Sequence, residues 1–139
     1  MTRFQRFEDI EAWQTARQLA NAIYDASEEG PFARDFGLRD QVRRAAVSVL
    51  SNIAEGFERE RPAEFIRFLT IAKGSVGELR AQLYIVADQG YVAPELSGHL
   101  RDEAARVSKM LGGLIAHLRQ AERQRVAGEQ DARQRKLDR

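Results

Sequence analysis

The chain of 139 residues has no cysteine, and this absence excludes disulfide bonds, thiolate metal sites and cysteine nucleophiles together. No uninterrupted apolar run reaches the roughly 18 residues that a membrane-spanning helix needs. The first residues also lack the apolar segment of a signal peptide. We therefore expect a cytoplasmic protein without covalent cross-links.

No charge of one sign dominates the sequence. The 22 basic and 21 acidic residues leave a formal net charge of +1. The small positive excess lies in residues 121–139, which carry 6 basic and 4 acidic side chains, against 16 and 17 in residues 1–120. The folded part therefore has no strong overall field to attract nucleic acid or anionic lipid.

Proline is scarce, and most of the glycines and prolines separate long segments in which apolar residues recur every three or four positions. This spacing is typical of amphipathic helices. Pro62 and Pro94 suit the first position of a helix, and Gly90 suits a helix end. The helices are predicted at about residues 8–28, 36–57, 62–89 and 94–120.

Four such helices with short connections favour an all-α fold, an antiparallel up-down-up-down four-helix bundle that forms one domain over residues 1–120. Residues 121–139 contain only Val126 and Leu137 as large apolar side chains. A helix there would have no apolar face to bury, so we expect this charged tail to be disordered or frayed.

The sequence offers little material for chemistry. Metal sites in ferritin-like bundles use Glu-x-x-His motifs, and this chain has none. The single pair His99 and Glu103, one turn apart, is typical of a solvated helix face. Ser48 and Ser51 have no histidine on a neighbouring predicted surface to act as a base. We therefore predict no catalytic residue, no cofactor, no metal and no small-molecule substrate.

A short basic cluster, Arg39, Arg43 and Arg44, is the candidate face for nucleic acid or another partner. The alternative interpretation is a solvated helix face that Asp35 and Asp40 neutralise, and the sequence favours this alternative.

Small residues indicate where the second and third helices approach each other. If their connection lies near residue 60, positions whose numbers sum to about 120 lie level. Close approach of the two backbones at such a level favours tight packing. The residues that we expect to face each other there are Ala45 and Ala46 with Gly74 and Ser75.

The third helix is apolar on more than one side. Besides its main stripe, a second line passes through Phe68, Ile71 and Ile85. A helix of a monomeric bundle needs only one buried stripe, so the second line predicts burial against another copy of the chain. We expect a homo-oligomer.

The second helix carries an amide and a carboxylate, Asn52 and Glu55, where an apolar stripe would continue. Aligning the first two helices places them near Trp13. Because a buried indole N–H needs an acceptor, we predict that Asn52 or Glu55 accepts it and forms a polar clasp that fixes the register.

Several stretches also occur in a characteristic order. They are Trp13 and Ala20, FGLRDQVRRAAVSVLSNIAEGFER at 36–59, EFIRFLTIAKGSVGEL at 64–79, the pair Gly90 and Tyr91, and KMLGGLIAHL at 109–118. In this order they resemble the bacterial four-helix-bundle proteins of the 23S rRNA intervening-sequence family, over about residues 7–120.

The resemblance implies a left-handed up-down bundle that assembles as a ring-like homopentamer, without enzymatic activity or cofactor. A related protein, the accessory variability determinant of diversity-generating retroelements, has the same architecture and binds nucleic acid through a strongly basic surface. The folded part of this chain is nearly neutral by comparison. It also has Arg61 before Pro62, where family members often have a serine or threonine cap.

Two functional hypotheses follow. The first is a non-catalytic, pentameric helical scaffold or adaptor that acts with ribosomal RNA or a nucleoprotein partner. The second is direct RNA or DNA binding by Arg39, Arg43 and Arg44, because a weak patch repeated around an oligomer gains by avidity. An enzyme is a distant third.

Overall fold

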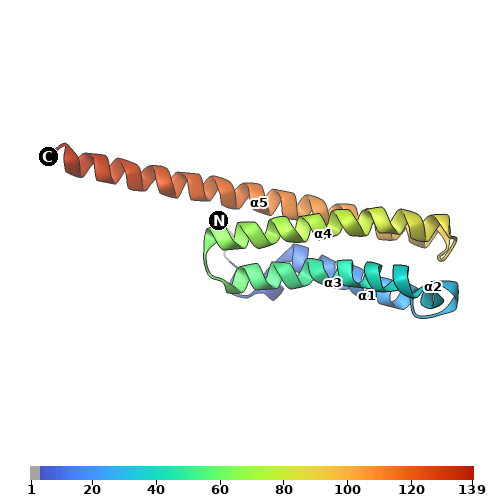
Figure 1. The fold of residues 1–139 in the computed structure, drawn as a ribbon. Helices are drawn as coiled ribbons and strands as arrows, with labels where there is room; N and C mark the ends of the chain where they lie inside the picture. The colour runs from blue at the N-terminus through green and yellow to red at the C-terminus, as the bar shows by residue number, and fades with distance from the viewer. Residues whose placement is uncertain (1–3) are drawn as a thin grey trace.

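A computed structural model describes residues 4–139, and its regular structure in that range is helical (Figure 1). A single 3-10 turn, η1, precedes the α-helices. Helices α1, α3, α4 and α5 are long, and α2 is a short connector. The predicted all-α bundle is confirmed. The elements are η1 (Phe7–Asp9), α1 (Glu11–Ala26), α2 (Gly30–Arg34), α3 (Phe36–Glu58), α4 (Pro62–Asp88) and α5 (Pro94–Leu137).

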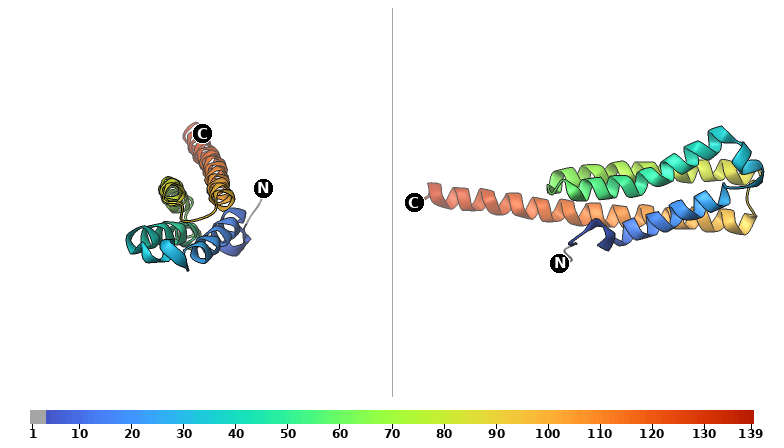
Figure 2. Two further views of the ribbon diagram at one scale, coloured as in Figure 1. Left: turned by 90° about the vertical axis from the view of Figure 1, so that its right-hand side faces the viewer. Right: turned by 90° about the horizontal axis from the view of Figure 1, so that it is seen from below.

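The four long helices pack against one another, and consecutive long helices run in opposite directions (Figures 1 and 2). The most extensive packing is that of α3 on α4, followed by α4 on α5. Helix α1 closes the bundle because it contacts both α3 and α5.

One hydrophobic core runs along the bundle axis, and each long helix contributes one stripe to it. The stripes have the helical spacing that the sequence shows, so the hydrophobic effect selects the same face of each helix that the periodicity predicts. Fully buried side chains of this core include Ile23, Val42, Val49, Ile53, Leu69, Val76, Leu79, Leu83, Leu100 and Leu111.

The helix ends use conventional local devices. The Asp35 side chain caps α3 by accepting a hydrogen bond from the backbone N–H of Leu38 at 3.2 Å. Pro62 and Pro94 each occupy the first turn of their helix. Gly90 follows α4 with a φ of 68°, a left-handed conformation that glycine adopts without strain.

The start of α3 is tied to the distant connection between α4 and α5. The hydroxyl of Tyr91 donates a hydrogen bond to Asp35 at 2.9 Å. This bond is the main cause that raises the pKa of Tyr91 above its ordinary value. The Tyr91 ring also stacks on Phe32 of α2, at 5.5 Å between ring centroids. Helix α2 connects α1 to α3 and also contributes a residue to the core, since Phe32 is buried there.

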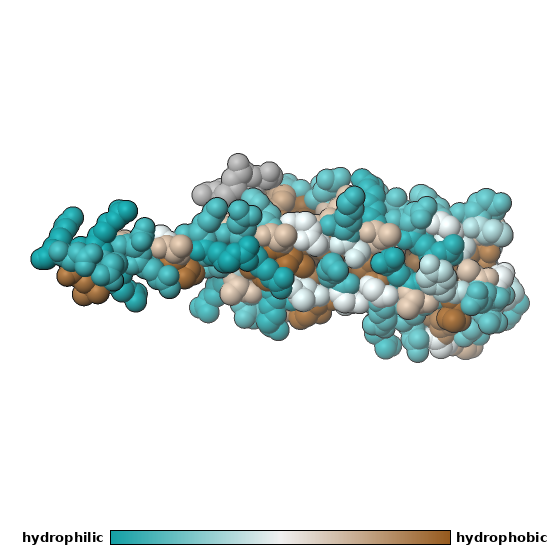
Figure 3. All heavy atoms as spheres, turned by 90° about the horizontal axis from the view of Figure 1, so that it is seen from above, coloured by the Kyte–Doolittle hydropathy of each residue, from teal (hydrophilic) through white to brown (hydrophobic). Residues whose placement is uncertain are grey.

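The C-terminal segment differs from the expectation of disorder, since α5 continues without interruption to Leu137. From Arg123 onward every residue is exposed, so this part, the overhang, extends beyond the bundle (Figure 1). Its surface is mostly hydrophilic (Figure 3). Arg125 pairs with Glu122 and Glu129, one turn away on either side, and such pairs support a helical segment in which no residue is buried.

Among residues 4–139, no helix combines the length and the apolar character that crossing a bilayer would require.

Candidate functional site

The three residues of the predicted polar clasp do not meet in the structure. The indole N–H of Trp13 is buried and has no acceptor within residues 4–139. Asn52 instead donates to the backbone oxygen of Ser48, one turn earlier in α3, at 2.8 Å. Glu55 is exposed and pairs with Arg59 at 3.0 Å. The clasp prediction was wrong because both side chains find partners on their own helix.

A different polar link joins α3 and α4. Asn52 also donates to the hydroxyl of Ser48 at 3.0 Å, and this hydroxyl lies 3.0 Å from that of Ser75 in α4. Ser75 therefore contacts α3, as the small-residue prediction expected, and its hydrogen-bond partner there is Ser48.

A close approach of α3 and α4 lies at a glycine of α3 that was not predicted to take part. Ala45 and Ala46 are buried, whereas Gly74 is exposed and has no neighbouring atom where a side chain would begin. An added Cβ at Gly56 would lie only 2.6 Å from the Cβ of Phe68. Ser75 lies level with Ser48 rather than with Ala45, so the predicted register was displaced by about three residues, nearly one helical turn. The close approach at Gly56 is a separate contact, nearer the connection between the two helices, and was not predicted.

The predicted basic face is largely engaged within the chain. Arg43 donates to the hydroxyl and the carbonyl of Ser27, at 2.8 and 3.2 Å, and its guanidinium lies over the ring of Tyr24. Arg39 donates to a backbone carbonyl of α2 and pairs with Asp40 at 3.0 Å. Arg44 is exposed and is in no ion pair within the described residues. Two of the three arginines therefore hold helix ends together.

The residues of the predicted oligomer face separate into two environments. Phe68 is only 6% exposed, because its Cβ side lies against Gly56 and the guanidinium of Arg67 covers its ring at 4.5 Å. The prediction that Phe68 belongs to the oligomer face was therefore wrong, because other residues of the same chain cover it. Ile71 and Ile85 remain 42% and 47% exposed on the outer side of α4.

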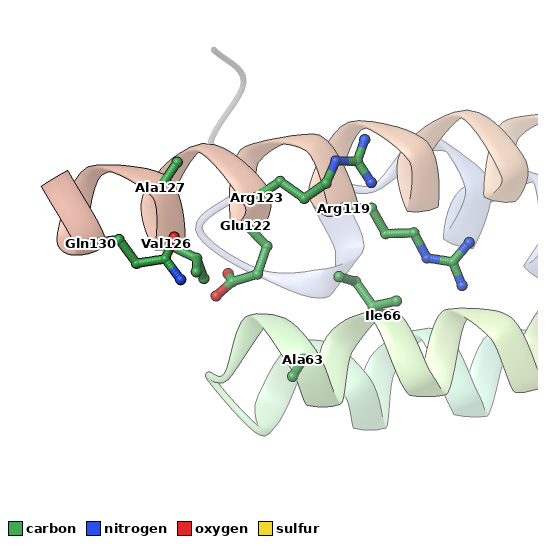
Figure 4. A pocket seen from close by; sticks show the side chains of 8 residues that line it. All are labelled: Ala63, Ile66, Arg119, Glu122, Arg123, Val126, Ala127 and Gln130. Atoms are coloured by element: carbon green, nitrogen blue, oxygen red, sulfur yellow. The ribbon is translucent and has the colours of Figure 1, made fainter.

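A groove that sequence reasoning missed lies between the start of α4 and the start of the overhang (Figure 4). It has a volume of about 490 Å³ and is open along one side. The prediction that the last helix ends near residue 120 concealed this groove, since five of its eight lining residues come later. Oppositely charged residues lie one turn apart around Arg125, and this pattern could have led us to predict a longer helix. The lining residues are Ala63, Ile66, Arg119, Glu122, Arg123, Val126, Ala127 and Gln130.

The charges at this groove are unbalanced. Arg119 and Arg123 are exposed, and neither has a carboxylate within 4.0 Å in the part of the chain that the structure describes. Glu122, the one acidic residue of the lining, is held by Arg125. Its hydrogen bond and charge raise the pKa of Arg125. Two arginines are therefore free to contact a partner.

The histidines do not form a metal centre with their neighbours. His99 lies beside Glu103 and Arg106 at a small cavity between α1 and α5, and Arg106 pairs with Glu103 at 3.8 Å. His117 is exposed. Among residues 4–139, no three side chains of the types that commonly bind metals come together.

Comparison with known proteins agrees with the resemblance seen in the sequence. A crystal structure of a protein with unknown function from the S23 ribosomal protein family, from Bacteroides thetaiotaomicron, matches this fold with a TM-score of 0.70 and 21% sequence identity. The match covers 76% of this chain and 95% of that protein, and at this identity it shows the fold alone. No curated protein matches. Residues 8–113 match the family model described as 23S rRNA-intervening sequence protein, which is most of the chain. The chain therefore belongs to the 23S rRNA-intervening sequence protein family.

Proposed function

We propose that this protein is a non-catalytic, homo-oligomeric helical scaffold or adaptor. The observation that carries the proposal is the outer side of α4, where Ile71 and Ile85 are exposed on a helix whose opposite side already fills the core. Exposed apolar residues in line on one helix face are typical of a contact surface rather than of a solvated one.

The shape of this face supports contact with a second helix. Gly74 and Gly77 lie between the two isoleucines in the sequence, and open space surrounds the position where a Cβ would begin at each of them. A helix from another copy can therefore approach the α4 backbone closely, with the isoleucines packing at either end of the contact. Five copies, as the family resemblance implies, are the proposed stoichiometry.

The other parts of the proposal rest on the sequence and on the family. The chain has no cysteine, and its two histidines are exposed and far apart in the sequence, so we propose no catalytic residues. Association with ribosomal RNA or with a nucleoprotein partner is proposed from the family description. Direct nucleic-acid binding by the Arg39 cluster has weaker support, since Arg39 and Arg43 already have partners within the chain.

Light scattering after size exclusion, at micromolar concentration, tests the proposal. The native protein should elute at about 79 kDa, five times the 15.8 kDa of one chain. Ile71→Glu and Ile85→Glu should each shift the mass toward the monomer, because each replaces an apolar side chain of the contact with a negative charge on the side of α4 that already carries Glu78. Val47→Glu is the matched control, since Val47 is a comparably exposed apolar residue on α3.

A monomeric native protein would refute the oligomer. An oligomer that Val47→Glu disrupts and the two isoleucine variants leave intact would place the contact elsewhere, and the α4 face would then be wrong.

A further inference from the structure

We propose that the groove between α4 and the α5 overhang is a docking site for an acidic amphipathic helix of another protein. The inference rests on the proposed adaptor function and names the kind of partner that the adaptor would hold. It starts from three features of the groove: an apolar floor, a length suited to a helix, and two arginines without acidic partners.

The floor is apolar where two helices diverge. Ile66 and Ala63 belong to the first turns of α4, and Val126, which is 38% exposed, faces them from α5 (Figure 4). Helix α4 begins at Pro62, and in the part of the chain that the structure describes no other helix continues its line, while α5 extends further (Figure 1). The groove thus lies where α4 begins and α5 extends further without a neighbouring helix in the described part of the chain.

The overhang supplies length for a helical partner. It runs from Arg123 to Leu137, a distance of about 22 Å at 1.5 Å per residue. Leu137 is 75% exposed and comes eleven residues after Val126, three helical turns later and therefore on the same side. A partner helix placed beside the overhang could contact Ile66, Val126 and Leu137 in succession, which is the helix-in-groove mode of recognition.

The charge of the groove selects an acidic partner. Arg119 and Arg123 stand at its edge without carboxylates within 4.0 Å in the described part of the chain, and Glu122 is held by Arg125. A helix with an apolar stripe and glutamates or aspartates beside it would supply both the apolar contact and the missing charge. A nucleic acid would pair with the arginines but leave the apolar floor uncovered.

The apolar face proposed for contact between copies does not fit the groove as well. The outer side of α4, around Ile71 and Ile85, carries Glu78 but also Arg67, so it has no net negative charge to offer. Charge complementarity therefore favours a different protein over a second copy as the occupant.

Fluorescence anisotropy with the full chain tests the proposal. The probe is a labelled synthetic 18-residue helix with leucines on one stripe and glutamates on both flanks. The control probe has lysines in place of the glutamates. We expect the acidic probe to bind and the basic probe not to bind. The double variant Arg119→Glu, Arg123→Glu should weaken binding of the acidic probe about tenfold, because repulsion between like charges then replaces two attractive ion pairs.

Two further variants separate the groove from general charge effects. Arg34→Glu, Arg44→Glu changes the net charge equally at exposed arginines elsewhere, and it should leave the affinity within about twofold. Val126→Gln should weaken binding severalfold without changing any charge. All three variants alter exposed side chains, so circular dichroism should show unchanged folding.

Several outcomes would overturn the proposal. These are no binding at roughly 100 μM, equal binding of the basic probe, or equal weakening by the two double arginine variants. Tighter binding of a 20-nucleotide oligouridylate that depends on Arg119 and Arg123 would make the groove a nucleic-acid surface.

The Ile85→Glu variant separates this test from the test of the oligomer. If the Ile85→Glu variant still binds the acidic probe, the groove acts independently of the oligomer. If the variant loses both the oligomer and the probe, the groove proposal is overturned and the probe binds at the contact between copies.

Discussion

Replacing Gly56 with alanine tests how closely α3 and α4 approach each other. The new Cβ would lie 2.6 Å from the Cβ of Phe68 and 3.3 Å from a ring carbon of Phe65. The ring of Phe65 can rotate, but the Cβ of Phe68 is fixed to the α4 backbone. Carbon atoms pack at about 3.5–4.0 Å, so the two helices would have to separate by about 1 Å.

Two effects of opposite sign determine the result. Alanine gains about 1 kcal/mol over glycine within a helix. Overpacking a tight contact costs about 1–3 kcal/mol, and more when backbones must move. Because the close atom belongs to α4 itself, we expect the cost to exceed the gain by about 1–2 kcal/mol. For a domain of this size, the Tm should fall by about 3–7 °C.

Gly113→Ala is the matched control. Gly113 lies within α5, is exposed, and has no atom within 4 Å of a new Cβ. The same substitution there should stabilise the protein by about 0.5–1 kcal/mol. Urea unfolding followed by circular dichroism measures both variants. If Gly56→Ala is as stable as Gly113→Ala, the close approach of α3 and α4 does not exist and our account of their packing is wrong.

Arg43→Ala should lower the free energy of unfolding by about 1–2 kcal/mol, because it removes the hydrogen bonds to Ser27 at the end of α1. Arg44→Ala should change it by less than about 0.5 kcal/mol, and equal urea midpoints for the two variants would contradict this assignment. The pKa of Tyr91 is raised mainly by its hydrogen bond to Asp35, so the folded chain holds this proton more tightly than the unfolded chain. The stabilisation is therefore complete below about pH 10 and is lost as the pH rises further. The stability difference between the native protein and Tyr91→Phe should shrink in that range, and a difference that stays constant would contradict the linkage.

The bundle was predictable from the sequence because burial and helix ends both depend on local patterns. The apolar stripe of α4 fixes its buried side, and Pro62 and Pro94 mark helix starts. Asp35 caps α3 with its own side chain, a preference that also depends only on the local sequence. Each of these features is determined within one helix, so no knowledge of neighbouring helices is required.

The candidate sites were less predictable because they depend on the register between helices. Asn52 was expected to reach Trp13, but the amide bonds to the backbone of its own helix, a local interaction that competes with long-range partners. A register error of about three residues also sets Ser75 level with Ser48 rather than with Ala45. The close contact of Gly56 with Phe68 was not predicted. Phe68 looked exposed from its position on α4, yet an arginine side chain covers its ring.

The overhang of α5 also affects how unfolding will look in different measurements. Its helix makes no core contacts, so it should melt gradually by local helix–coil exchange, while the bundle unfolds cooperatively. Circular dichroism sums both parts. Trp13, the single tryptophan, lies in α1 and packs against Phe7 of η1. Its fluorescence therefore reports the unfolding of the bundle alone. Thermal curves from ellipticity and from tryptophan fluorescence should therefore diverge, and the divergence would imitate a folding intermediate even where the bundle itself unfolds in one step.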